Sequence, residues 1–265
     1  MSRPGTCLSL VILTEDSGKD ARATTEALVR AMLGLVVPGY GRHRVELLPS
    51  EPSEEEAMRG NVWKADGKNP RDYERRVRLL KYIARKLCLA STFVVFHVDG
   101  DRTWAERDTS ENLAKFERLV RTLLPQVADR GRASARRTRR TREADMEPPA
   151  PALRVDHLLL FTPFRSVEAW LYQNIQRAIE ICRREHGGRH VESLAAWEEK
   201  RGDLDELPRP EQEVCLEKGY NLELASRGFP AGTVYDVQKS FAESVDRMRQ
   251  CTELKAALER TLDAG

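Results

Sequence analysis

Two aspartates separated by a single glycine are the residues of this sequence whose types and spacing best suit chemistry. The run Val94-Val95-Phe96-His97-Val98 stops at Asp99-Gly100-Asp101. An apolar, β-branched run of this kind is typical of a buried strand. Two carboxylates this close together are costly unless a cation neutralises them. The pattern therefore predicts a cation at the end of a strand, against the simpler interpretation that Asp-Gly is ordinary turn and helix-cap chemistry.

A second strand-like run also ends on an acid. Residues 8–13 are followed by Thr14-Glu15-Asp16-Ser17-Gly18. In parallel sheets, ligands bind outside the carboxyl ends of the strands, so we expect Glu15, Asp99 and Asp101 to share one site. Oxygen ligands favour Mg²⁺, with Mn²⁺ as a substitute. The alternative for Glu15 is an acid that complements the dipole of the following helix.

The elements that must position these acids alternate along the chain. This order predicts an α/β fold with a mostly parallel, four-stranded sheet flanked by helices. We expect strands over 8–13, 45–48, 93–98 and 155–161, helices over 20–34, 71–89, 108–127 and about 166–186, and a loop or excursion over 49–70. The predicted domains are an α/β domain over 1–187 and a helical C-terminal region over 188–265.

Composition narrows the class of protein. The 265 residues are 40% hydrophobic and 32% charged, and no apolar run reaches the roughly 18–20 residues that span a bilayer. The N-terminus lacks the features of a signal peptide, so we expect a cytoplasmic protein without a membrane partner. Five scattered cysteines, without a CxxC pair, support neither a zinc knuckle nor a disulfide framework. The serine-hydrolase, P-loop and dinucleotide motifs are also missing.

An arginine-rich stretch is the predicted nucleic-acid element. Residues 130–142 contain seven arginines and no acid, within a low-complexity segment over 129–152 that we interpret as a flexible loop. Such a segment would make salt-sensitive, sequence-independent phosphate contacts. The predicted contact residues are Arg136, Arg137, Arg139 and Arg140, with Lys19 near a helix start. The alternative for the arginine-rich segment is a loop that only aids solubility, and the alternative for Lys19 is a lysine that only contacts solvent.

These motifs resemble the Toprim domain of topoisomerases, DnaG-type primases, maturation ribonucleases and overcoming-lysogenization-defect nucleases. The resemblance rests on Glu15 after the first strand and on Asp99-Gly100-Asp101 after a later one, over roughly residues 7–175. The segment Ser166-Val167-Glu168-Ala169-Trp170-Leu171 is similar to a helix start in an uncharacterised Toprim-like family of bacterial defence and mobile islands. One departure is that Glu15 is followed by Asp16-Ser17-Gly18, where the family usually has Glu-Gly.

The resemblance implies magnesium-dependent phosphodiester chemistry. Asp99 and Asp101 would bind Mg²⁺, Glu15 would be a general acid/base or a further ligand, and Glu168 would complete a second metal position. Topoisomerase and primase activities would need modules that this chain lacks, so a nuclease remains, with DNA or RNA as substrate. The resemblance also implies an antiphage effector that works with an ATPase sensor. The alternatives are a non-catalytic nucleic-acid or partner-binding module and a nucleotide phosphohydrolase.

Overall fold

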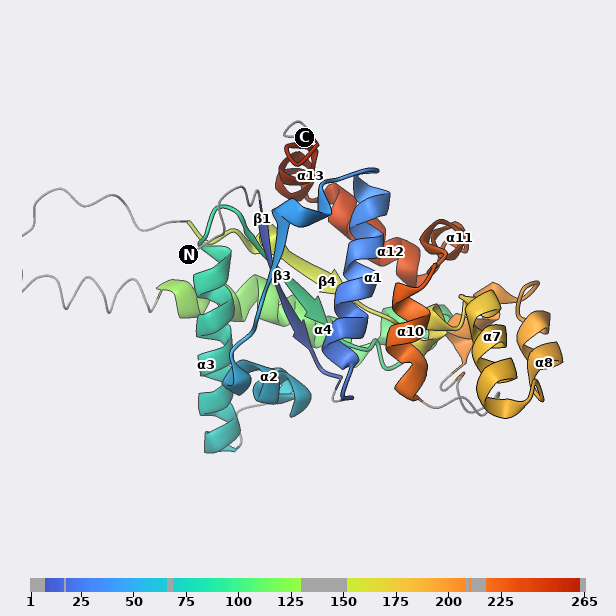
Figure 1. Cartoon of the computed structure of the whole chain (residues 1–265). Helices are drawn as coiled ribbons and strands as arrows, with labels where there is room; N and C mark the ends of the chain where they lie inside the picture. The colour runs from blue at the N-terminus through green and yellow to red at the C-terminus, as the bar shows by residue number, and fades with distance from the viewer. Residues whose placement is uncertain are drawn as a thin grey trace, which may run out of the picture.

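A four-stranded, all-parallel sheet lies at the centre of the molecule (Figure 1). The computed structural model describes residues 8–16, 18–65, 69–129, 152–207, 210 and 218–262. The strand order is β2-β1-β3-β4, and the strands are β1 (Leu8–Thr14), β2 (Val45–Leu48), β3 (Thr92–His97) and β4 (Leu158–Phe161). This confirms the predicted α/β fold. Because β1 and β3 are the two inner strands, their carboxyl ends are neighbours.

Helices cover both faces of this sheet. The described helices are α1 (Ala21–Val36), α2 (Pro52–Arg59), α3 (Pro70–Leu87), α4 (Glu111–Arg118), α6 (Glu168–Leu171), α7 (Ile175–His186), α8 (Val191–Ala196), α10 (Asn221–Ser226), α11 (Ala231–Asp236), α12 (Ser240–Gln250) and α13 (Thr252–Glu259). Shorter 3₁₀ turns lie at Arg42–Arg44, Val62–Lys64, Trp104–Thr109, Val155–His157, Arg201–Glu206 and Lys218–Tyr220, and a π turn at Leu119–Leu123 extends α4.

The strands are mostly apolar because each strand contributes side chains to two cores. In β3, Phe93 and Val95 belong to one core, whereas Val94 and Phe96 belong to the other. The alternation follows from the two-residue period of a strand. A continuous apolar run is therefore the expected pattern for a parallel sheet with helices on both faces.

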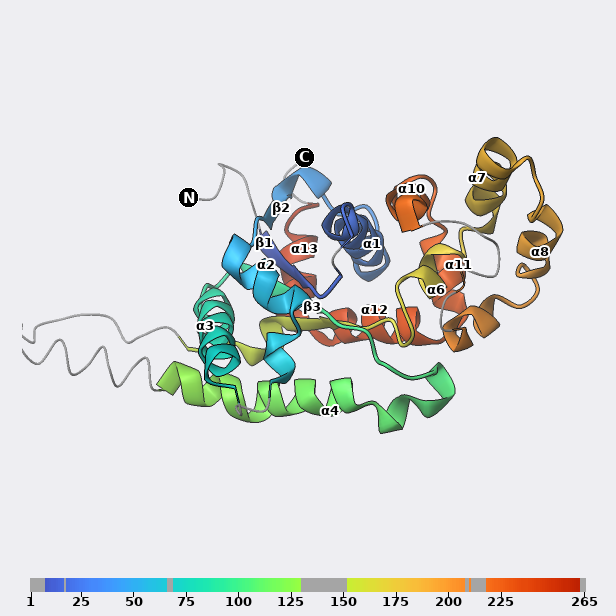
Figure 2. The same ribbon diagram turned by 90° about the horizontal axis from the view of Figure 1, so that it is seen from below.

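The first core packs α1 and the C-terminal helices against the sheet. It joins the β1 side chain of Leu10 to Leu33 of α1 and to Phe241 of α12. Figure 2 shows α1 and α12 near the strands, with α10 and α11 next to them. The C-terminal helices thus complete the hydrophobic core on this face. The division at residue 187 remains a prediction about domain organisation.

The second core packs α2, α3 and α4 against the opposite face. Buried residues of α3 include Leu80 and Ile83, and α4 adds Phe116. In Figure 2, α4 lies across the molecule below the strands, on the side away from α1. Together the two cores make a three-layer helix–sheet–helix arrangement.

Several predicted boundaries were wrong. Of the two alternatives for segment 49–70, the structure supports an excursion rather than a loop, because the segment contains α2 and a 3₁₀ turn at Val62–Lys64. The predicted helix over 166–186 is two helices, α6 and α7, with Tyr172, Gln173 and Asn174 between them. The strand predicted over 155–161 begins only at Leu158, after a 3₁₀ turn. Each short turn uses local backbone hydrogen bonds that a hydrophobic pattern does not encode.

A buried chain of hydrogen bonds, the Trp–Ser–Asp chain, joins α6 to α12. Trp170 donates its indole N–H to Ser240 Oγ at 2.6 Å, and Ser240 donates to Asp205 Oδ1 at 2.6 Å. Burial raises the pKa of Asp205 to about 6. Because all three side chains are buried, the chain fixes the segment that follows β4 against the C-terminal helices.

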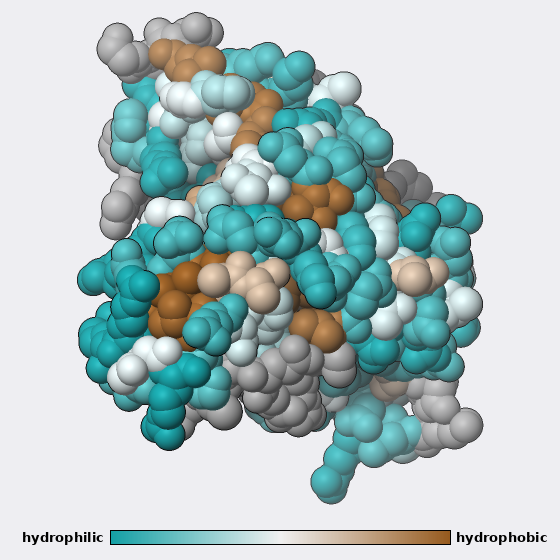
Figure 3. All heavy atoms as spheres, turned by 90° about the vertical axis from the view of Figure 1, so that its right-hand side faces the viewer, coloured by the Kyte–Doolittle hydropathy of each residue, from teal (hydrophilic) through white to brown (hydrophobic). Residues whose placement is uncertain are grey.

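The face that carries α7 and α8 is mixed in polarity. In Figure 3, separate apolar patches lie among hydrophilic side chains on this side of the molecule. Within the described part of the chain, no helix is both long and apolar enough to span a bilayer.

Candidate metal site at the carboxyl edge of the sheet

The ends of β1 and β3 bring two of the predicted acids together. Thr14 is in register with His97, so the residues that follow them leave the sheet side by side. Glu15 Oε1 accepts a hydrogen bond from the backbone N–H of Asp99 at 2.6 Å. The first acidic loop and the Asp-Gly-Asp loop are therefore in direct contact.

The Asp99-Gly100-Asp101 loop is held closely by its neighbours. The Gly100 N–H donates to the Pro163 carbonyl at 2.8 Å, and Asn112 donates to the Asp99 carbonyl at 2.7 Å. A Cβ on Gly100 would lie 2.8 Å from the ring of Phe164 and 3.0 Å from its Cα, so only glycine fits. Asp101 adopts a left-handed backbone with φ of 59°, a conformation that aspartate tolerates better than most residues. These contacts fix where both carboxylates emerge.

His97 lies between two carboxylates beneath this loop. Its ring is fully buried and shares a hydrogen bond of 2.7 Å with the Thr14 hydroxyl through Nδ1. Nδ1 lies 3.8 Å from Asp16 Oδ2, and Nε2 lies 3.7 Å from Asp99 Oδ1. Burial opposes protonation of the ring, but the carboxylates of Asp16, Asp99 and Glu15 outweigh it and raise the pKa of His97. The ring therefore holds a proton beside the acids more readily than an ordinary histidine.

The carboxyl group of Asp99 is a weaker acid here than in an ordinary aspartate. Burial raises the pKa of Asp99 to about 6, and the negative charges of Asp16 and Glu15 add to the effect. His97 acts in the opposite direction but does not cancel the shift. A second positive charge near Asp99 would thus stabilise its ionised form.

Lys64 also reaches the site, although no pattern in the sequence indicated it. Its ammonium nitrogen lies 3.0 Å from Glu15 Oε2. The adjacent Trp63 is buried and packs edge-on against Phe96 of β3, with ring centroids 5.3 Å apart. The turn at Val62–Lys64 is therefore anchored to the sheet and presents the lysine to the acidic loops.

We call Glu15, Asp16, Asp99 and Asp101 the acidic edge. Lys64 pairs with Glu15, and His97 lies between Asp16 and Asp99, so these three carboxylates face at most two positive charges even when the ring is protonated. Oδ1 of Asp99 and Oδ1 of Asp101 are buried and accept no hydrogen bond within the described residues, although His97 Nε2 lies 3.7 Å from Asp99 Oδ1 as an ion-pair neighbour. Buried carboxylate oxygens without hydrogen bonds are costly. A hard divalent cation such as Mg²⁺ would satisfy them, so the donor set fits the predicted metal.

The acids are not gathered as tightly as ligands of a bound ion. Among the residues that the structure describes, a group with three ligand atoms all within 4.8 Å of one another occurs at Asp156, His157 and Glu253, not at the acidic edge. Mg²⁺ commonly keeps several waters and binds through one or two carboxylates. The wider spacing therefore suits an ion held partly through water.

The other predicted site residues lie elsewhere or outside the described part of the chain. Glu168 is buried in α6, and its Oε1 accepts a hydrogen bond of 2.8 Å from Asn221. Lys19 is exposed in the turn before α1. The four arginines predicted to bind nucleic acid, together with most of the predicted 129–152 loop, lie outside the described residues.

Three residues of the site lie outside the acids predicted from the sequence. Asp16 directly follows Glu15 in the first acidic loop, and His97 is the last residue of β3. The two-residue period of β3 did place His97 on the same face as Asp99. For Lys64, the sequence offered no signal, because its position depends on how the segment after β2 folds back.

Comparisons with protein-family models, with curated proteins and with solved structures find no match to this chain. Its function must therefore be inferred from the geometry of the acidic edge and from the motif resemblance.

Proposed function

We propose that this protein is a Mg²⁺-dependent Toprim-like nuclease that cleaves phosphodiester bonds of DNA or RNA. The observation that carries the proposal is a pair of buried oxygens, Asp99 Oδ1 and Asp101 Oδ1, that accept no hydrogen bond within the described residues. They belong to the loop in which the Asp99 N–H donates to Glu15, at the carboxyl ends of neighbouring strands. This is the edge where parallel α/β sheets bind ligands. Mn²⁺ would substitute for Mg²⁺.

Each residue of the site has a role in this proposal. Asp99 and Asp101 would hold the ion, which when bound polarises a phosphoryl oxygen and stabilises charge on the attacking and leaving oxygens. Glu15 would be the general acid/base for the attacking water or a further ligand of the ion. The Lys64 ammonium, which competes with the ion for Glu15, would attract the phosphate. His97 would keep a proton near Asp99. Because Glu168 is bound by Asn221, a second metal position at Glu168 would need that contact to break.

The biological setting of the proposal rests on the resemblance alone. This setting includes a role in antiphage defence and restraint or activation by a partner such as an ATPase sensor. It also includes nucleic-acid contacts from Arg136, Arg137, Arg139 and Arg140. An unrestrained nuclease would be toxic to its own cell. We therefore expect expression of the protein alone to be less toxic than expression with its activating partner.

The test is a cleavage assay of the purified chain on plasmid DNA and on total RNA, with Mg²⁺, Mn²⁺ or EDTA. We expect cleavage that requires the metal and disappears in Asp99→Ala. Asp108→Ala is the matched control, because Asp108 is exposed in the neighbouring turn and should leave cleavage unchanged. Cleavage that persists in EDTA, or in Asp99→Ala, would contradict the proposal.

Two other functions would give different results in the same experiments. A non-catalytic module would bind nucleic acid without cleaving it under any divalent ion, and the ion pair between Glu15 and Lys64 is the observation that favours this alternative. A nucleotide phosphohydrolase would hydrolyse nucleotides and be indifferent to deletion of residues 130–142. The same deletion should impair a nuclease on long substrates.

A further inference from the structure

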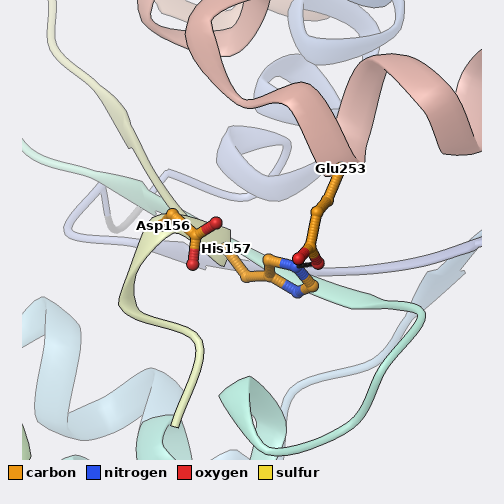
Figure 4. A group of neighbouring side chains, drawn as sticks. All are labelled: Asp156, His157 and Glu253. Atoms are coloured by element: carbon orange, nitrogen blue, oxygen red, sulfur yellow. Dashed lines mark hydrogen bonds and ion pairs between the residues drawn. The ribbon is translucent and has the colours of Figure 1, made fainter.

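A second cluster of metal-ligating side chains lies at the opposite end of the sheet. Asp156 and His157 immediately precede β4, and Glu253 extends from the first turn of α13 to meet them (Figure 4). One ligand atom from each residue lies within 4.8 Å of the other two. We call these three residues the amino-edge cluster. It shares no residue with the acidic edge, so a role for this cluster does not depend on the proposed nuclease activity.

The backbone determines which nitrogen of His157 carries a proton. Nδ1 lies 3.0 Å from the carbonyl oxygen of Thr92, at the start of β3. A carbonyl oxygen can only accept, so Nδ1 must be the donor and hold a hydrogen. In a neutral ring the lone pair is then on Nε2. This arrangement, in which the far nitrogen donates to a backbone carbonyl, is the usual one for a metal-ligating histidine.

The Nε2 lone pair points at another acceptor. Nε2 is in close contact with Glu253 Oε2, as Figure 4 shows. Two acceptors face each other stably only when a proton lies between them, or when both turn toward a metal ion that they share. The His157 ring is fully buried and stacks on Phe93 with centroids 4.1 Å apart, so it cannot turn away. The geometry thus demands a positive charge at this point.

We propose that the amino-edge cluster binds a borderline divalent metal ion, with Zn²⁺ as its best representative. Imidazole nitrogen together with carboxylate oxygen is a donor set that zinc accepts, and three protein ligands leave a fourth position for water. Two carboxylates and a neutral imidazole balance the charge of the ion. Mg²⁺ is a poorer fit, because it prefers an all-oxygen shell.

One neighbouring group influences the site. Arg154 lies with Nε 3.6 Å from Glu253 Oε2 and competes with an ion for that oxygen. An ion at the cluster would tie α13 to the start of β4, across 96 residues of sequence.

The experiment is isothermal titration of the full chain with Zn²⁺, in a reducing buffer without chelator, beside a titration with Mg²⁺. The test variant is Glu253→Gln, whose amide can donate to Nε2 and so removes the need for a cation. Because the Glu253 side chain is 51% exposed, this change should preserve the fold. The matched control is Glu259→Gln, on the same helix and 53% exposed.

We expect one Zn²⁺ per chain with micromolar or tighter affinity, at least tenfold weaker binding in Glu253→Gln, and unchanged binding in Glu259→Gln. Co²⁺ bound at the same site should show d–d absorption without thiolate charge-transfer bands. The proposal is overturned if Zn²⁺ does not bind at 100-fold excess over the protein, or if Glu253→Gln binds it as well as the wild type. An absence of Zn²⁺ binding would mean that a proton, and not a metal ion, lies between His157 Nε2 and Glu253 Oε2.

Discussion

Replacement of Asp99 by asparagine should stabilise the metal-free protein. Because burial and neighbouring carboxylates raise the pKa of Asp99 to about 6 from its ordinary value of 3.8, the ionised form is disfavoured in the folded state. The difference corresponds to about 3 kcal/mol at pH 7.5. The side chain keeps 30% exposure, so solvent screening reduces the expected gain to about 2 kcal/mol. That gain is roughly 4–8 °C in Tm for a chain of this size.

The stability difference between Asp99→Asn and the wild type should depend on pH. The cost of the ionised Asp99 is fully present above pH 6 and disappears as the pH falls through the window down to 3.8. Asparagine carries no such cost at any pH. The stability advantage of Asp99→Asn should therefore fall by roughly half between pH 7.5 and pH 5, and it should vanish below pH 3.8.

The assay is thermal or urea unfolding in EDTA at pH 7.5 and at pH 5, with Asp108→Asn as the exposed control. Addition of Mg²⁺ should then raise the Tm of the wild type and leave Asp99→Asn nearly unchanged, because the ion relieves the same cost. A lower stability of Asp99→Asn than of the wild type at pH 7.5 in EDTA would refute this explanation. An equal difference at both pH values would refute it as well, since the gain would then not come from ionisation.

Three further changes test other parts of the structure. Lys64→Ala removes an ammonium that competes for Glu15, so Mg²⁺ affinity should rise several-fold in a titration; weaker binding would mean that the lysine organises the site. Gly100→Ala forces a Cβ against Phe164 and should lower stability by about 1–3 kcal/mol in urea unfolding, whereas a neutral result would show that the loop can move. Ser240→Ala removes the hydroxyl that joins Trp170 to Asp205. It should lower the free energy of unfolding by about 1–3 kcal/mol in the same assay. A decrease below about 0.5 kcal/mol would mean that the Trp–Ser–Asp chain adds little to stability.

The fold was predictable where a pattern of apolar residues in the sequence fitted only one kind of secondary structure. Runs such as Leu8–Thr14 are buried on both faces of a parallel sheet. Three of the four predicted strands end within one residue of the observed ends, and only the start of β4 was misplaced. Helix α2 was missed because half of its eight residues are charged and it buries only Glu54, Ala57 and Met58. Its one local signal was Pro52 at the first helical position, which the loop interpretation passed over.

The candidate site was only partly predictable, for a geometric reason. Glu15 and Asp99 follow strands that pair in register, so strand order alone brings them together. Lys64 arrives from a turn whose position depends on how Trp63 packs against β3. The contact between His157 and Glu253 joins residues 96 apart through the docking of α13. Neither contact produces a repeating pattern of residues in the sequence. Neither could therefore be inferred without the tertiary structure.

The two proposed ion sites should act independently, because β3 separates them. Thr92 orients His157 at one end of this strand, and His97 contacts Asp99 at the other. Five steps of about 3.3 Å place the two ends roughly 17 Å apart. Effects at sites more than about 7–10 Å apart usually add. The rise in Tm with Zn²⁺ and Mg²⁺ together should therefore equal the sum of the separate rises, and Asp99→Asn should abolish only the magnesium part. A rise well below the sum would show either that both ions compete for one site or that the sheet couples its two ends.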